Sequence, residues 1–201
     1  KIYTGTMDAT AVRAAYTSAF PFLEHHWDFS NAASAIIDDL VTGVLAQATI
    51  EAGVAAHRLA TGVELGRAAN NYISLDLSSS TLGGPMTIEL VVRWDAPTSA
   101  LPMQPFVCDD SGGNSYGIFG AAALPGGGGG SLVWAIAQSG NSYMASSSGS
   151  VPDAGVRKHI VVTTSGTAMR VYVNGGQVGS TTPGVDLIAV ARSCFVGKKV
   201  D

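Results

Sequence analysis

The chain has 201 residues, of which 46% are hydrophobic and only 13% are charged, and its formal net charge is −4. This length and apolar content suffice for one well-covered core, so we expect one main domain. The slightly acidic balance provides no basic field for nucleic acid or anionic lipid, and no apolar run approaches the roughly 20 residues of a membrane-spanning helix, so we expect neither nucleic-acid binding nor membrane insertion.

The first predicted element is a short strand at residues 1–3, and the second is the only predicted helix. Asp8 can cap this helix, because an aspartate side chain accepts hydrogen bonds from the free amides of a first helical turn. Val12, Ala15 and Tyr16 then fall on one helical face. We therefore expect one short helix near the N-terminus.

After this helix the pattern is one of strands and turns. Alternation with a period of two is clearest in residues 86–94, which therefore have one drier face. Ile88, Leu90, Val92 and Trp94 alternate there with Thr87, Glu89, Val91 and Arg93. The Ala-rich residues 36–65 contain enough Val, Ile and Gly to favour short strands over helix. The other expected strands are residues 24–29, 72–76, 103–108, 116–121, 131–137, 159–164 and 169–173.

Two glycine-containing segments predict turns or loops. Asn174-Gly175, followed by Gly176, predicts a tight hairpin, because a type I′ turn needs positive φ at both central residues. This turn would join residues 169–173 to residues 177–180. The five glycines of residues 126–130 are expected to form a mobile loop, since ordering them costs much conformational entropy.

The order of these elements resembles the laminin-G-like, concanavalin A-like jelly-roll family, in the type that occurs in tandem on large extracellular proteins. The resemblance covers most of the chain. It implies an all-β fold, a two-sheet antiparallel jelly-roll sandwich, here with one short N-terminal helix. The motifs that carry it are His26-Trp27-Asp28-Phe29, Asn70-Asn71-Tyr72-Ile73-Ser74-Leu75 and residues 86–94, 158–163 and 170–175.

Compared with the family fold, this chain begins and ends at a different point in the order of elements. The family ends with a strand of the type Ile-Asp-Asp-x-Arg-Ile-Tyr and a short Ala-rich helix, and the equivalents here are at the N-terminus. Val200 and Asp201 lead into Lys1, Ile2 and Tyr3 as one interrupted strand. We interpret these five residues as an assembly strand.

This arrangement divides the chain into residues 1–17, the terminal strand and helix, and residues 18–201, the jelly-roll domain. The first segment completes a preceding or neighbouring sandwich, or this one in cis. Three interpretations stay open: a plain chain boundary, closure in cis, and closure by a neighbouring subunit or repeat. The last would join copies head to tail into a filament, because an open sheet edge accepts a further strand.

The sequence contains no carboxylate pattern typical of a glycoside hydrolase. Such an enzyme needs two carboxylates about 5–9 Å apart around the scissile bond. In the lyases and glucanases that share the concanavalin A-like sandwich, these carboxylates come from a strand with the motif Glu-x-Asp-x-x-Glu. Glu89 and Asp76 each stand alone on their strands. His25, His26 and His159 are better explained by packing or hydrogen bonding. We therefore assign no catalytic residues and expect no enzyme.

Two further sets of residues are candidates for binding or bonding. Asp109, Asp110 and Asn114 bring oxygen ligands together on a tight loop, which suits Ca²⁺, although an exposed Asp/Gly turn explains them without metal. No other cofactor is expected. Cys108 and Cys194 predict either one disulfide between two strands or two buried thiols, and no Cys/His spacing suggests zinc.

Aromatic side chains are the main candidates for glycan contact, because sugar rings stack on them. Trp27 and Trp94 match core positions of the family and are expected to be buried. Trp134 is less constrained and is the first candidate for glycan binding. Tyr116 and Tyr143, each next to serine, are the second.

Two functions compete at this point. The first is a non-catalytic extracellular structural or adhesive module, repeated in tandem or assembled head to tail into a filament by strand sharing, whose partners are copies of itself or adjacent repeats. The alternative is a carbohydrate-binding, lectin-like module of a larger extracellular protein, whose partners are glycans. Both place the chain outside the cell or at its surface.

Overall fold

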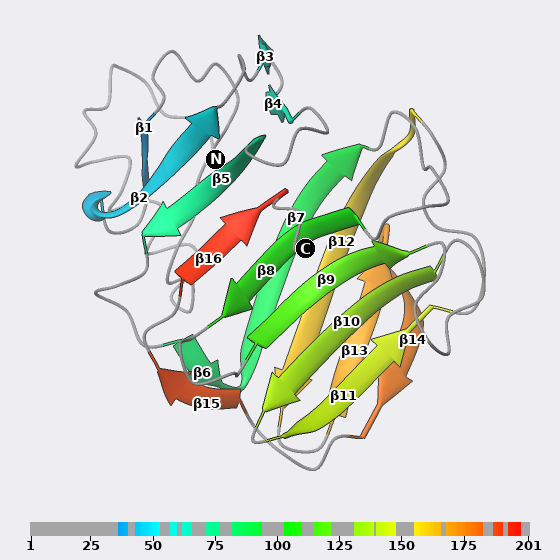
Figure 1. Ribbon diagram of the computed structural model, residues 1–201. Coiled ribbons are helices and arrows are strands. Elements are labelled where there is room, and N and C mark those ends of the chain that lie inside the picture. Colours follow the sequence, from blue (N-terminus) through cyan, green and yellow to red (C-terminus); the bar gives the residue numbers. More distant parts are fainter. Residues whose placement is uncertain are drawn as a thin grey trace, which may run out of the picture.

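A computed structural model describes the chain over residues 36–39, 43–52, 57–59, 62–65, 71–76, 82–93, 103–109, 115–121, 131–138, 140–147, 155–165, 168–182, 187–190 and 193–197. Every regular element within these residues is a β-strand, and the strands form two main antiparallel sheets (Figure 1). The helix expected after Asp8, the strand at residues 24–29, the glycine run at residues 126–130 and the domain boundary after residue 17 lie outside the described residues.

The larger sheet has eight strands and forms the front layer in Figure 1. Near its middle, β16 from the C-terminal part of the chain lies between β5 and β8. In spatial order its strands are β1 (Ile36–Asp39), β2 (Gly43–Ala52), β5 (Asn71–Asp76), β16 (Ser193–Val196), β8 (Met103–Asp109), β9 (Ser115–Ala121), β10 (Ser131–Gln138) and β11 (Asn141–Ser146).

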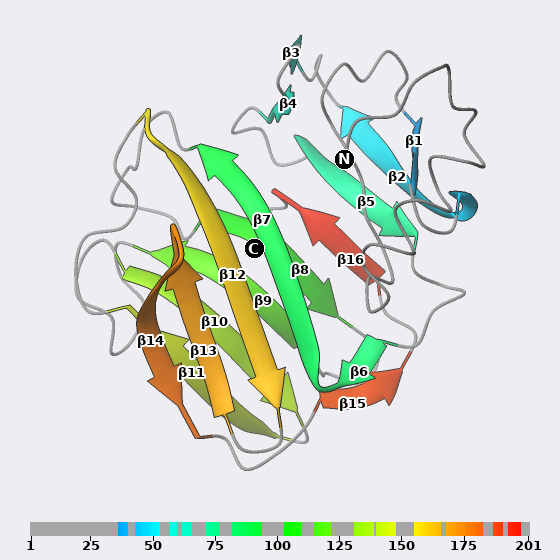
Figure 2. The same cartoon turned by 180° about the vertical axis from the view of Figure 1, so that it is seen from behind.

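The smaller sheet has four strands and is the nearer layer when the molecule is turned around (Figure 2). Its spatial order is β14 (Gly176–Thr181), β13 (Ala168–Val173), β12 (Arg157–Ser165) and β7 (Met86–Arg93). Two short pairs complete the fold: β6 (Leu82–Gly84) with β15 (Leu187–Val190), and β3 (His57–Leu59) with β4 (Gly62–Glu64). The prediction of an all-β, two-sheet antiparallel jelly-roll sandwich is confirmed.

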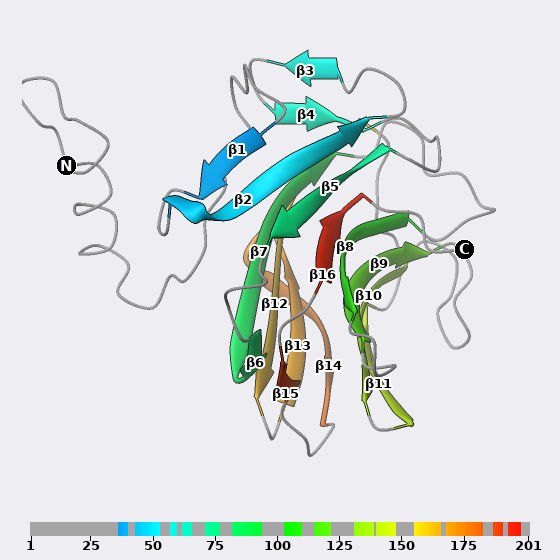
Figure 3. The ribbon, with the colours of Figure 1, turned by 60° about the vertical axis from the view of Figure 1, so that its left-hand side comes forward.

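The core lies between the two sheets, where β10 and β11 face β13 and β14 (Figure 3). Each strand contributes alternate residues, because successive side chains of a strand point to opposite faces. The larger sheet contributes Leu132, Trp134 and Ile136 of β10, and the smaller sheet contributes Ile160 and Val162 of β12, all fully or almost fully buried. The core is therefore built from the residues on one face of each of these strands.

The hairpin between β13 and β14 has the expected turn. Asn174 and Gly175 both have positive φ, +50° and +83°, as a type I′ turn requires. The Asn174 side chain also reaches the neighbouring strand: its Oδ1 accepts a hydrogen bond from the backbone N–H of His159 at 3.0 Å. The backbone N–H of Asn174 donates to the carbonyl of His159 at 2.8 Å. The turn is thus attached to β12 as well as closing its own hairpin.

Most of the expected strands are present, with ends shifted by one or two residues. The Ala-rich segment forms strands β1 to β4, as expected, but β2 has ten residues and only the other three are short. Strand β11 was not anticipated, because its sequence, Asn-Ser-Tyr-Met-Ala-Ser, contains few β-branched residues. Its antiparallel pairing with β10 over residues 133–138 explains why it is extended.

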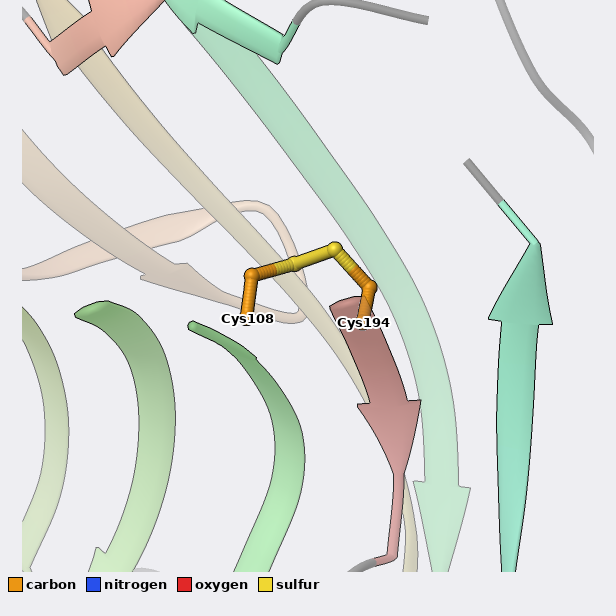
Figure 4. Close-up of a disulfide and its surroundings, with 2 residues drawn as sticks. All are labelled: Cys108 and Cys194. Atoms are coloured by element: carbon orange, nitrogen blue, oxygen red, sulfur yellow. A yellow bond between two sulfur atoms is a disulfide. The ribbon is translucent and has the colours of Figure 1, made fainter. Parts of the chain in front are cut away.

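One covalent bond joins neighbouring strands of the larger sheet. Cys108 of β8 and Cys194 of β16 are directly opposite each other, with their Cα atoms 4.1 Å apart, and they form a disulfide (Figure 4). Both are completely buried in the core. Of the two alternatives open for these cysteines, the structure has the disulfide, which holds β16 in the middle of the sheet although 86 positions separate the two residues.

Breaking this disulfide is expected to destabilise the fold, because the bond restricts a long loop in the unfolded chain. The double substitution of Cys108 and Cys194 by alanine should lower the free energy of unfolding by about 2–5 kcal/mol. Urea denaturation of the variant, and of the unmodified chain with and without reductant, measures this. Equal midpoints for the oxidised and reduced chain would contradict the prediction.

Close contact between the sheets predicts a second stability effect. A Cβ atom built on Gly179 of β14 would lie 2.4 Å from the backbone oxygen of Ser146 of β11, whereas one on Gly176 would have its nearest neighbour at 3.6 Å. Gly179→Ala should therefore cost about 1–3 kcal/mol through overpacking, and the matched control Gly176→Ala should cost much less. Thermal unfolding of both variants tests this, and equal losses would refute it.

Candidate functional site

The outer face of the larger sheet, which points away from the core, carries a continuous row of apolar or side-chain-free positions. Phe195 of β16, Val107 of β8, Gly117 of β9, Ala135 of β10 and Met144 of β11 are each directly opposite the next. The five strands span about 19 Å at the usual strand spacing. We name these five positions the outer apolar row. Val107 is only 5% exposed and Gly117 is buried, so the accessible parts of the row are its two ends, at Phe195 and at Ala135 and Met144.

The surface is hollowed where this row crosses β9, β10 and β11. Gly117 has no side chain and Ala135 has a small one, so the floor is low, while the Met144 side chain stands beside it with 46% of its surface exposed. The hollow has a volume of about 160 Å³. Its lining comprises Ser115, Gly117, Ala135, Ile136, Ala137, Ser142 and Met144.

An aromatic pair lies at the other end of the outer apolar row. The rings of Tyr72 on β5 and Phe195 on β16 pack edge to face, with centroids 5.5 Å apart and planes at 87°. Both side chains are half-buried, so part of each ring remains accessible. The sequence reasoning did not select them, although Tyr72 and Ser74 alternate with the buried Ile73 and Leu75 and could have been placed outside on that signal.

A second row of positions, two residues further along the strands, is mainly polar. In the backbone register Ser193 stands between Asp76 and Asp109, so the two aspartate positions are two strand spacings, or about 10 Å, apart. Ser142 and Ser193 are exposed. We name this the outer polar row, and in spatial order it comprises Asp76, Ser193, Asp109, Ser115, Ala137 and Ser142.

The aromatic residues expected to contact glycans do not form a site together. Trp134 is 0% exposed and lies between Ile118 and Ala145 on the core side of the sheet, so no sugar ring can stack on it. This corrects the choice of Trp134 as the first candidate for glycan binding. Tyr143 is half-buried and packs against the core. The backbone of Tyr116 is paired with residues of β8 and β10.

The other expected site residues fall at or beyond the limits of the described chain. Asp109 is the last residue of β8, and Asp110 and Asn114 lie outside the described residues. No group of three or more His, Cys, Asp or Glu side chains suited to a metal occurs among the residues that the structure describes, and calcium binding stays a prediction. The assembly strand, Lys1, Ile2, Tyr3, Val200 and Asp201, also lies outside them.

The outer face of the smaller sheet has a different chemistry. His159 Nε2 of β12 lies 2.6 Å from Glu89 Oε1 of β7, and the two side chains are 42% and 67% exposed. Glu89 is the only carboxylate among the described positions of this face. The second carboxylate that glycoside hydrolysis needs is therefore not beside it in this part of the chain.

Residues 67–199 match a laminin G sequence model of the concanavalin A-like lectin/glucanases superfamily. The chain belongs to this superfamily. The resemblance drawn from the strand motifs is confirmed for the matched residues, which include all the strands of the smaller sheet. A search of curated proteins found no match to this chain.

Solved structures share the fold at low sequence identity. Domain 4 of AbnA, a GH43 extracellular arabinanase from Geobacillus stearothermophilus in complex with arabinotriose, has a TM-score of 0.55 and 17% identity, covering 77% of this chain and 73% of that one. Mouse laminin alpha1 domains LG4-5 have a TM-score of 0.53 and 11% sequence identity, and the match covers 85% of this chain and 38% of the laminin chain. The binding domain of botulinum neurotoxin DC in complex with SialylT has a TM-score of 0.54 and 11% sequence identity, and the match covers 89% of this chain and 48% of the neurotoxin chain.

The chain thus spans less than half of the laminin and neurotoxin chains that it resembles. At these identities the likeness concerns the concanavalin A-like fold, and the chemistry has to be argued from the site. Within the described part of the chain, no helix has the length and apolar character to cross a membrane.

Proposed function

We propose that this chain is a non-catalytic carbohydrate-binding module of an extracellular protein and that it holds a glycan on the outer face of its larger sheet. The observation that carries the proposal is the outer apolar row next to the outer polar row. A sugar ring has apolar C–H surfaces and a rim of hydroxyl groups, so it needs both kinds of protein surface side by side.

The dimensions of the two rows suit a glycan chain that lies across the strands. Two residues along a strand separate the rows by about 7 Å. The outer apolar row crosses five strands, a width of about 19 Å, and the outer polar row crosses six strands, a width of about 24 Å. The Tyr72–Phe195 pair offers aromatic surface at one end, and the hollow beside Met144 offers a floor of small residues at the other. Serine hydroxyls and aspartates can exchange hydrogen bonds with sugar hydroxyls.

Two further observations support this proposal. Among the structures with this fold, the arabinanase domain is described in complex with arabinotriose and the neurotoxin domain in complex with SialylT. The buried disulfide suits an oxidising compartment, where such bonds persist, and this favours a place outside the cell. The proposal assigns Asp76 and Asp109 to sugar binding and not to bond cleavage.

Filling the hollow should weaken the binding of neutral glycans. Ala135→Arg places a long side chain on the outer face without touching the core, and it should weaken binding at least about tenfold. Thr87→Arg, on the exposed outer face of the smaller sheet, is the control with the same charge change. A neutral-glycan array, followed by calorimetry with the best hit, measures the effect.

Two results would contradict the proposal. One is an array without any hit for the unmodified chain, and the other is equal binding by the Ala135→Arg and Thr87→Arg variants. Release of shorter sugars from the bound glycan, lost on Asp76→Asn, would show catalysis and refute the non-catalytic assignment.

A second candidate function, a structural module that assembles head to tail, is favoured by the edge of the smaller sheet. Among the described strands β7 pairs only with β12. Its inward-facing Ile88, Leu90 and Val92 are only half-buried, whereas Ile160 and Val162 of β12 are at most 1% exposed. An additional strand along β7 would cover these side chains and pair the edge that the described strands leave unpaired. The assembly strand of another copy is the proposed source.

Strand sharing predicts that the chain self-associates through its ends. The full chain should show a mass by light scattering that rises with concentration, and removal of residues 1–5 should return it to the monomer. Substitution of Ile2 by aspartate should act in the same direction, because a charged side chain would have to be buried against β7. A full chain that stays monomeric at all concentrations would refute the filament.

A further inference from the structure

The hollow beside Met144 is lined mostly by apolar atoms, and its two polar side chains stand at opposite corners. Its lining contains no charged side chain. We infer that the hollow takes a methyl group of a neutral sugar, either the C6 methyl of a 6-deoxyhexose or the methyl of an N-acetylhexosamine. The inference rests on the proposed glycan-binding function and names the class of sugar that this site prefers.

The floor of the hollow consists of small apolar groups. Ala135 and Ala137 of β10 lie two positions apart on the outer face, so their methyl groups are about 7 Å from each other. Gly117 of β9 is directly opposite Ala135 and has no side chain to raise the floor beside it. Strands β9, β10 and β11 are neighbours in the larger sheet (Figure 1), and the hollow lies across them. A group that enters the hollow therefore meets methyl groups and glycine backbone.

The backbone beneath this floor has its hydrogen bonds satisfied within the sheet. Strand β10 is paired on both sides, with β9 over residues 131–137 and with β11 over residues 133–138. Its N–H and C=O groups are therefore used by the neighbouring strands. A sugar hydroxyl placed over Ala135 would lose its water without gaining a protein partner, which weakens binding. A methyl group in the same place has no hydrogen bond to lose and buries apolar surface.

Two serine hydroxyls stand at the corners of the hollow. Ser115 of β9 and Ser142 of β11 are each directly opposite Ala137, one on either side, so their positions are two strand spacings, or about 10 Å, apart. Ser142 is exposed and Ser115 is half-buried. Because a serine hydroxyl can both donate and accept a hydrogen bond, these corners suit the hydroxyl or amide groups that lie beside the methyl group on the same sugar. The rim thus receives the polar groups, and the floor receives the apolar one.

Met144 forms the wall of the hollow on the side of β11. It is directly opposite Ala135 and is 46% exposed. Its side chain is unbranched and polarizable, so it can adjust to the shape of an apolar group. The thioether has no donor and accepts hydrogen bonds only weakly. This wall therefore also favours a methyl group over a hydroxyl.

Size and charge narrow the ligand further. A volume of about 160 Å³ is below the roughly 300–1,000 Å³ of a pocket that encloses a whole small molecule. The hollow therefore takes one edge of one sugar unit, and the rest of the glycan extends along the outer face. Since no charged side chain lines the hollow, a carboxylate or sulfate there would lose its hydration without gaining a partner. The ligand class that fits is a neutral sugar that carries a methyl group.

The test compares pairs of sugars that differ by one oxygen atom on the methyl carbon. The pairs are L-fucose with L-galactose, L-rhamnose with L-mannose, and the N-acetyl with the N-glycolyl forms of glucosamine and galactosamine. Each sugar is attached to the same uncharged polymer, so that weak contacts add up. In at least one pair the methyl member should bind at least about tenfold more tightly, because an apolar site rejects an added hydroxyl by this factor or more. Biolayer interferometry measures the affinities.

Two matched variants tie the preference to the hollow. Ala135→Ser gives the floor a hydroxyl that can pair with the added oxygen, so it should reduce the preference for the methyl member to within about threefold. Ala168→Ser makes the same change on β13, opposite Ser165 in the smaller sheet, and should leave the preference as it is in the unmodified chain. Thermal unfolding confirms that both variants are folded.

The outcomes separate the two sources of the methyl group. A preference in the 6-deoxyhexose pairs identifies a methyl on the sugar ring, and a preference in the N-acyl pairs identifies an acetamido group. Either result, if Ala135→Ser reduces it and Ala168→Ser does not, supports the inference.

Three results would overturn the inference: equal binding within every pair, tighter binding of the hydroxyl member, or a preference that Ala135→Ser leaves unchanged. Equal binding within the pairs that Ala135→Arg still weakens would overturn the methyl preference and leave the neutral-glycan proposal standing. Absence of binding to all of these sugars also overturns the methyl preference, and the neutral-glycan array then decides separately on the proposed function.

Discussion

The burial of one face of each sheet against the other is the constraint on which the rest of the molecule depends. Strand β10 shows this directly: Leu132, Trp134 and Ile136 are almost completely buried, so the residues between them must lie on the other face. Antiparallel pairing extends that decision across the sheet, since each residue shares a face with its partner on the next strand. The outer apolar row and the outer polar row are consequences of where the core lies.

Strand β16 connects distant parts of the chain to this arrangement. It is short, it comes from the end of the described chain, and it lies between β5 and β8, to which the Cys108–Cys194 disulfide attaches it. With Cys194 directed into the core, Ser193 and Phe195 fall on the outer face, where they link Tyr72 and Asp76 of β5 with the rows on β8 to β11. The bond that stabilises the core thus also aligns the proposed glycan site.

The outer faces of the two sheets differ in the residues at their described positions. The larger sheet brings two aspartate positions into register around Ser193, and the smaller sheet exposes arginines with Glu89 as the only acid among its described positions. A chain with few charges and a net charge of −4 therefore has two chemically different surfaces. Proteins with the same fold can bind different ligands, because the surface residues of a strand can change without disturbing the core.

The sequence by itself determined the elements that depend on near neighbours. Alternation predicted β7, Asn174-Gly175 predicted the hairpin, and the order of motifs indicated the concanavalin A-like sandwich. Only the tertiary structure decided which face each strand buries and which distant residues meet: Trp134 lies inside, Tyr72 contacts Phe195, and Glu89 contacts His159 across 70 positions. The physical reason is that alternation defines two faces for a strand but does not say which one packs against the other sheet, and pairing between strands far apart in sequence leaves no local signal.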